Sequence, residues 1–165
     1  MSTEQERSRT FSWQDPGAAL QQAIGMTGLE AVCAMLDGTL PMAPIGEMMA
    51  FRGVEVDEGR VVVAVEPAEF HANNTGAAHG GLAATLLDSA MWLALHTTMP
   101  AGGLCSTVQM NLHYVRPLPI GGGEVRAEGR VVHRGRQTGT AEGRVTDGAG
   151  TLLVHATTAC VVYGA

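Results

Sequence analysis

The last third of the chain alternates between polar and apolar positions. From residue 124 to residue 130 every even position is charged and every odd position is small or aliphatic, and residues 138–146 repeat the pattern with some threonines. This alternation is typical of strands that bury one face. The runs 105–116 and 151–163 are rich in β-branched residues and are also predicted to be strands.

The two charged faces predict how their strands pair. In the favoured antiparallel register Arg130 lies opposite Glu142. The same register sets Glu128 opposite Arg144, whereas a shifted one would face Glu128 with Glu142, at a cost on the order of a few tenths of a kcal/mol. The favoured register leaves a three-residue loop at 135–137.

Residues 82–99 are apolar nearly all round, which indicates a buried helix ended by the turn 100–103. The inward-facing residues of the strands are unusually small: Gly129, Gly139, Ala141 and Gly143. The sheet can therefore approach such a helix closely. We therefore predict an α+β fold in which an antiparallel sheet wraps around one long central helix.

The N-terminal half is less regular. Residues 1–15 have alternating charges and no periodicity, and are expected to be a flexible tail before a single domain of residues 16–165. Residues 16–38 suit one or two short helices.

A proline-punctuated segment follows at Pro41 and Pro44, where regular structure is expected to stop. Residues 48–56 and 60–66 then read as a hairpin around the turn 57–59.

Composition narrows the class of protein. The 165 residues are 45% hydrophobic and 16% charged, which argues against disorder, and the net charge of −6 argues against nucleic-acid binding. Three widely spaced cysteines fit reduced thiols, and no metal site is expected from them or from the histidines. The N-terminus lacks the apolar region of a signal peptide, and the longest apolar run is too short to span a membrane. We expect a cytoplasmic protein.

Asp88 is the main candidate for chemistry. It is the only carboxylate between Glu69 and Glu124, and it lies midway along the apolar helix. Burying a carboxylate without partners costs several kcal/mol, so such a residue is either hydrogen-bonded into the fold or functional. Both interpretations are open on this feature alone.

The turn His79-Gly80-Gly81 precedes the same helix. Free N–H groups at a helix start can stabilise an oxyanion, although two glycines also suit an ordinary tight turn. Asp88 lies eight residues after Gly80, about 12 Å along a helix. Because both groups must reach one reacting carbon, their joint use predicts a homodimer whose subunits share each site.

A helix introduced by H-x-N-x-x-G-x-x-H-G-G (residues 71–81) and bearing Asp88 resembles the hotdog-fold acyl-CoA thioesterases of the phenylacetate-catabolism (PaaI-like) type. The resemblance runs from residue 28 to residue 162. It includes the approach 41–44, the strand 111–117 and the turn at 135–136.

The resemblance implies roles for individual residues. Asp88 would activate water or attack the thioester carbon, and Gly80, helped by Gly81, would donate its N–H to the thioester oxygen. Asn73 would position the thioester or the water, and Thr107 would hold the water. His79 would shape the loop or assist the oxyanion, while His71 is interpreted as structural.

The family's coenzyme A contacts would fall to Arg116, Arg134 and Arg136, for which solvated surface arginines are the alternative. Trp92 departs from the family, which often has a small residue there, and would either reshape the acyl pocket or pack at a subunit interface.

The implied reaction is hydrolysis of an acyl-CoA to a free acid and CoA, with Asp88 as general base or nucleophile and no cofactor beyond the CoA of the substrate. Dimers of this class often build tetramers, so a dimer of dimers is the alternative assembly. A non-catalytic acyl-CoA-binding module and a hotdog hydratase are the competing functions. The acyl group is not specified by the sequence.

Overall fold

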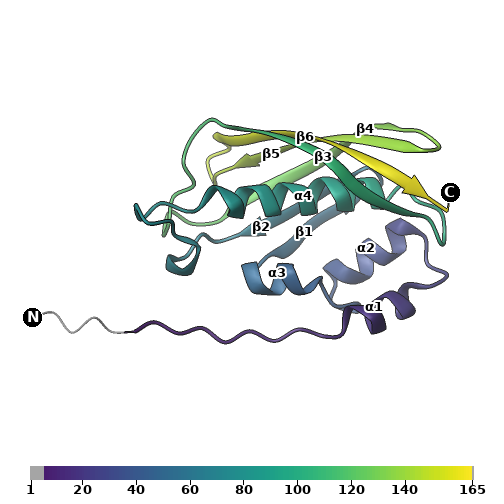
Figure 1. Ribbon diagram of the computed structural model, residues 1–165, viewed down its shortest axis with the longest axis horizontal. Helices are drawn as coiled ribbons and strands as arrows, with labels where there is room; N and C mark the ends of the chain where they lie inside the picture. The colour runs from purple at the N-terminus through teal and green to yellow at the C-terminus, as the bar shows by residue number, and fades with distance from the viewer. Residues whose placement is uncertain (1–5, 165) are drawn as a thin grey trace, which may run out of the picture.

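The computed structural model describes residues 6–164 and forms one antiparallel sheet around a long helix (Figure 1). The strands are β1 (Arg52–Asp57), β2 (Arg60–Val65), β3 (Leu104–Tyr114), β4 (Val125–Arg134), β5 (Thr138–Thr146) and β6 (Leu152–Tyr163), in the order β1-β2-β4-β5-β6-β3. The helices are α1 (Pro16–Ala23), α2 (Gly28–Leu36), α3 (Pro44–Met49), the short 3₁₀ turn η1 (Glu69–His71) and α4 (Gly80–His96). The expected fold is confirmed. In the described part of the chain, no helix is long and apolar enough to cross a membrane.

The sheet curves closely over α4, and its small inward residues make this possible. A Cβ atom at Gly129 would lie 2.3 Å from the backbone oxygen of Ala90, and one at Gly143 would lie 2.9 Å from Leu87 and Met91. Leu86, Leu87 and Met91 are fully buried beneath the sheet. The central helix can therefore be buried this closely because β4 and β5 carry glycines at the points nearest to it.

The predicted register of β4 and β5 is confirmed, with Arg130 opposite Glu142 and Glu128 opposite Arg144. A bulge after Val131 shifts the pairing by one residue, and the strands are joined by the predicted three-residue loop 135–137. The ion pairs of Glu128 run to Arg60 on β2 and to Arg130 on its own strand.

The predicted start of the first strand was wrong. Met48 and Met49 belong to α3, which Pro44 begins at its first turn, and Ala50 ends this helix in the left-handed region at φ 57°. The strand β1 begins only at Arg52. Proline at the first helical position favours a helix start, so the proline-punctuated segment contains regular structure where none was expected.

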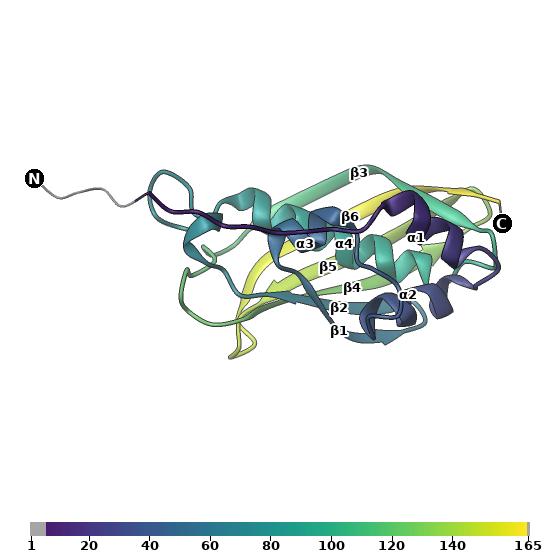
Figure 2. The ribbon, with the colours of Figure 1, turned by 90° about the horizontal axis from the view of Figure 1, so that it is seen from below.

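Residues 6–15, part of the expected tail, run along the helical side of the molecule towards α1 (Figure 2). Arg9 donates hydrogen bonds to the carbonyls of Met48 and Glu47, and its guanidinium lies 3.9 Å from the centre of the Phe70 ring. We call residues 9–15 the strap. The first five residues of the expected tail lie outside the described residues.

Candidate active site

Asp88 and Thr107 meet at the middle of α4. Asp88 lies on the helix, half-buried, and Thr107 lies on β3, the strand at the sheet edge nearest to this part of α4. The Thr107 hydroxyl donates a hydrogen bond of 2.9 Å to Oδ1 of Asp88. One carboxylate oxygen is thus held by a hydroxyl, an arrangement suited to orienting a base or a nucleophile.

Asp88 also lines an apolar cavity of about 640 Å³. Trp92 and His96 follow it at intervals of four residues, so the three side chains form one stripe on the face of α4 that lines this cavity. The Trp92 N–H donates to the carbonyl of Cys105 at 2.8 Å, and its indole stacks on His96 with ring centres 4.8 Å apart. Trp92 therefore forms a fixed wall of the cavity.

His96 was not predicted from the sequence to be a site residue. Its spacing of four residues from Trp92 and eight from Asp88 could have placed it on the same face of the helix. It is only 7% exposed, and burial lowers the pKa of its imidazole, so the ring is neutral near pH 7. Its Nδ1 is buried without a hydrogen-bond partner among the described residues.

The start of α4 holds the second group of candidate residues. His79 precedes the helix and its Nδ1 accepts a hydrogen bond of 2.9 Å from the Gly81 N–H. The Gly81 amide is therefore engaged, while the Gly80 N–H makes no hydrogen bond to any described residue. Tyr114, which the sequence did not indicate, donates its hydroxyl to the Gly80 carbonyl at 3.0 Å.

Asn73 organises the loop before α4. Its side-chain oxygen accepts hydrogen bonds from the Thr75 amide and hydroxyl and, at 3.3 Å, from the Ala77 amide. Asn73, His79 and Gly80 are not among the described residues that line the Asp88 cavity. Eight residues of helix, about 12 Å, separate Gly80 from Asp88. Within one chain the candidate residues thus form two separate groups.

The three candidate coenzyme A arginines are also divided. Arg116 lies where β3 ends, donating to the Leu152 carbonyl, whereas Arg134 and Arg136 lie by the β4–β5 loop. Measured along β6 from Leu153 to Cys160, the two places are roughly 23 Å apart. Arg134 is half-buried with a nitrogen 3.7 Å from the Met99 sulfur, and Arg136 is exposed. One chain does not bring the three together.

His71 ties the loop before α4 to α3, in keeping with its structural interpretation. Its Nδ1 accepts from the Ala68 N–H at 3.0 Å and its Nε2 lies 3.1 Å from the Met49 carbonyl, so the ring donates there and is neutral.

Acidification is expected to destabilise the protein through His71. Burial lowers the pKa of its imidazole, and the Arg9 charge acts in the same direction. As the pH falls below about 6.5, the unfolded chain takes up this proton first, so the free energy of unfolding decreases. Urea unfolding at roughly pH 7.5 and pH 5.5 checks this. The decrease should be smaller in His71→Gln than in the wild type, and equal decreases would contradict the assignment.

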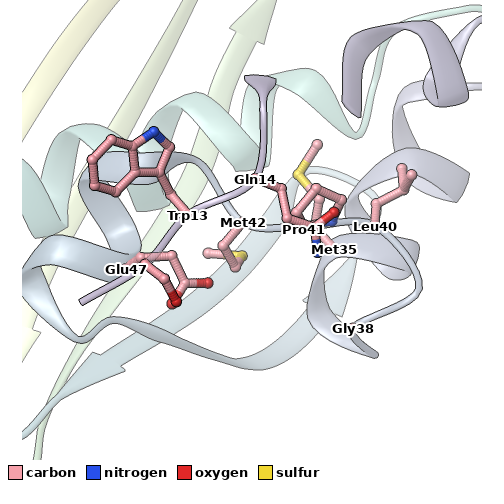
Figure 3. A pocket seen from close by; sticks show the side chains of 9 residues that line it. Trp13, Gln14, Met35, Gly38, Leu40, Pro41, Met42 and Glu47 are labelled. Carbon is pink, nitrogen blue, oxygen red and sulfur yellow. The ribbon is translucent and has the colours of Figure 1, made fainter. Parts of the chain in front are cut away.

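A second cavity of about 350 Å³ lies beside the first, beneath the strap. Figure 3 shows Trp13 and Glu47 on one side of it and Leu40 with the loop at Gly38 on the other. The two cavities have five lining residues in common: Gln14, Met35, Leu40, Pro41 and Met42. Flexible methionines therefore form part of the wall between them.

Comparison with known proteins identifies the family. Residues 75–154 match the family model of the Thioesterase superfamily. An esterase-like protein of Halobacterium salinarum is 31% identical over 125 residues, which cover 71% of this chain and 81% of that protein. The chain belongs to the thioesterase superfamily.

This thioesterase is 37% identical to human acyl-coenzyme A thioesterase 13 over 68 residues, which are 41% of this chain and 48% of the human protein. Its fold also matches a mutant structure of the phenylacetic acid degradation protein PaaI of Thermus thermophilus, with 30% identity and a TM-score of 0.66. That match covers 72% of the thioesterase and 98% of the PaaI chain. The predicted PaaI-like family is confirmed, and with it the class of thioester hydrolases.

Proposed function

We propose that this thioesterase hydrolyses acyl-CoA to a free acid and CoA, with Asp88 as the reacting carboxylate. The observation that carries the proposal is the hydrogen bond from Thr107 to Asp88 in the wall of an apolar cavity. A purely acyl-binding module has no need of a carboxylate there, since an unpaired charge beside an apolar ligand is costly. The names of human acyl-coenzyme A thioesterase 13 and of the PaaI relative agree with this choice.

The proposed reaction has two forms that these residues support equally. In the first, Asp88 takes a proton from a water held by Thr107, the water oxygen adds to the thioester carbon, and the C–S bond then breaks to release CoA. In the second, a carboxylate oxygen of Asp88 attacks the carbon and displaces CoA, and water hydrolyses the resulting anhydride. In both, the Gly80 N–H stabilises the oxyanion, and no metal or cofactor takes part.

The proposal requires a homodimer, because Gly80 and Asp88 are about 12 Å apart along one helix. Gly80 of one subunit would serve Asp88 of the other, with Asn73 and His79 arriving on the same loop. The edge strand β3 offers a surface for pairing, since Leu104, Val108 and Tyr114 are all exposed there. A dimer of dimers would preserve such shared sites.

Arg134 and Arg136 are proposed to hold the phosphates of CoA beside the β4–β5 loop. The proposed location of the protein is the cytoplasm.

Mixed oligomers test whether the sites are shared. We expect Asp88→Asn and Gly80→Val to be inactive alone, because a side chain at Gly80 would press on the Tyr114 ring 3.2 Å away. Coexpressed with different tags, the two variants should regain about a quarter of wild-type activity, since half of the dimers are mixed and each has one intact site. Two differently tagged Asp88→Asn chains serve as control. No recovery would place a complete site within one chain.

Thiol release from a panel of phenylacetyl-, benzoyl- and straight-chain acyl-CoA esters tests the function itself. Turnover of at least one ester by the wild type is expected. Acyl-CoA binding without any thiol release would instead support the non-catalytic module. Hydration of an enoyl-CoA without thiol release would support the hydratase.

A further inference from the structure

The Asp88 cavity is enclosed by a helix that precedes the region matched to the family model. Its first wall is the stripe of Asp88, Trp92 and His96 on α4. The opposite wall belongs to α1, through Pro16, Ala19, Leu20 and Ala23. The family match begins at residue 75, so this second wall lies outside it. We call this space the α1–α4 pocket.

The helix α1 lies over this pocket without being packed into the core. None of its residues is buried, its sequence PGAALQQA has no charged side chain, and Leu20 is 55% exposed. Asp15 caps its start, accepting from the Gly17 N–H, and Gly25 follows its end at φ 89°. The strap before it is fixed at its far end by Arg9. The chain is thus tied to the rest of the molecule on either side of α1, by Arg9 in the strap and by the hydrogen bond from the Gly28 N–H to the Met99 carbonyl. Between these ties, α1 faces an apolar cavity.

The lining of the α1–α4 pocket restricts what can fill it. Among the described residues, Asp88 is its only charged lining residue, and the wall opposite α4 is made mostly of aliphatic and aromatic side chains, including Leu20, Met35, Met42 and Phe51. A second carboxylate in the pocket would lose its hydration without gaining a cationic partner. An uncharged, apolar occupant would gain about fourfold in affinity per buried methylene.

We propose, on the basis of the proposed function, that the acyl group of the substrate lies beneath α1 along the stripe from Asp88 towards His96. The substrates are therefore elongated, uncharged, apolar acyl-CoA esters. The strap and α1 form the lid of the pocket, and Leu20 is a specificity-determining residue. The stripe is about 12 Å long, so short acyl groups leave most of the pocket unfilled.

A chain-length series measured with matched variants tests the proposal. The wild-type kcat/KM is expected to rise about fourfold per added methylene from acetyl- to hexanoyl-CoA and to stay high for decanoyl-CoA. Leu20→Ala should lower the ratio of decanoyl to acetyl kcat/KM about fivefold or more. Ile24→Ala is the matched control, because Ile24 is 68% exposed next to α1 and does not line the pocket. Its ratio should equal that of the wild type.

A variant that fills the pocket complements Leu20→Ala, which only shortens a side chain of its wall. Ala19→Trp adds an indole to the α1 wall and leaves Asp88 and Thr107 themselves unchanged, so it should reduce decanoyl-CoA turnover far more than acetyl-CoA turnover. Three results would each refute the proposed acyl site beneath α1 while leaving thioester hydrolysis intact. They are a wild-type kcat/KM that does not depend on chain length, equal decanoyl-to-acetyl ratios for Leu20→Ala and Ile24→Ala, and a preference for succinyl-CoA over hexanoyl-CoA. Hydrolysis of no ester at all would overturn the proposed function instead.

Discussion

Replacing Asp88 with asparagine is expected to lower kcat for the best acyl-CoA ester by about a hundredfold or more. The asparagine oxygen can still accept the Thr107 hydrogen bond, so the position and fold of the side chain should be preserved. What is lost is the ability to take a proton or to attack the thioester carbon. Because these steps act on the transition state, the loss should appear in kcat rather than in KM.

Continuous thiol detection with purified protein measures this effect. Asp57→Asn is the matched control, since Asp57 ends β1 on the outer face of the sheet and pairs there with Arg60. This control should retain wild-type kcat. Full activity in Asp88→Asn would leave the family assignment standing and refute the role given to this carboxylate.

Gly129→Ala is expected to destabilise the protein by about 3 kcal/mol, although it adds one methyl group. That methyl would lie 2.3 Å from the Ala90 oxygen and 2.7 Å from the Met91 nitrogen, both backbone atoms of α4. Neither can move aside as a flexible side chain would, so strand and helix must separate and the packing around them must loosen.

The urea midpoint of Gly129→Ala, compared with that of Gly148→Ala, measures this cost. A Cβ atom at Gly148 would meet nothing within 4 Å, so the same substitution should be close to neutral there. Similar midpoints for the two variants would mean that β4 does not approach α4 as closely as the structure has it.

The sheet could be predicted from the sequence because its signals are local and redundant. Alternation defined β4 and β5, and the opposed charges of Arg130 with Glu142 fixed their register independently of the loop. The bulge after Val131 was not predictable, since it depends on how β4 curves over the helix rather than on a residue type.

The cavity was harder to foresee than the reacting groups. Asp88 and Thr107 could be paired through the resemblance, and they lie in contact. The walls of the α1–α4 pocket come from segments far apart in sequence, such as Leu20, Met42 and Trp92, and no periodicity links them. Likewise, the strap has no hydrophobic period that predicts its docking, which combines Arg9 against carbonyls and an aromatic ring with Trp13 at the smaller cavity.

The distribution of indoles gives the molecule a built-in optical readout. Its two tryptophans, Trp13 and Trp92, line the smaller and the larger cavity respectively. Trp13 is 58% exposed, whereas Trp92 is half-buried and hydrogen-bonded, so their emission should differ in wavelength. Filling of the larger cavity would change the surroundings of Trp92 first, and a shift of Trp13 emission would mark movement of the strap. Ligand entry and lid displacement are thus separable by fluorescence in the unlabelled protein.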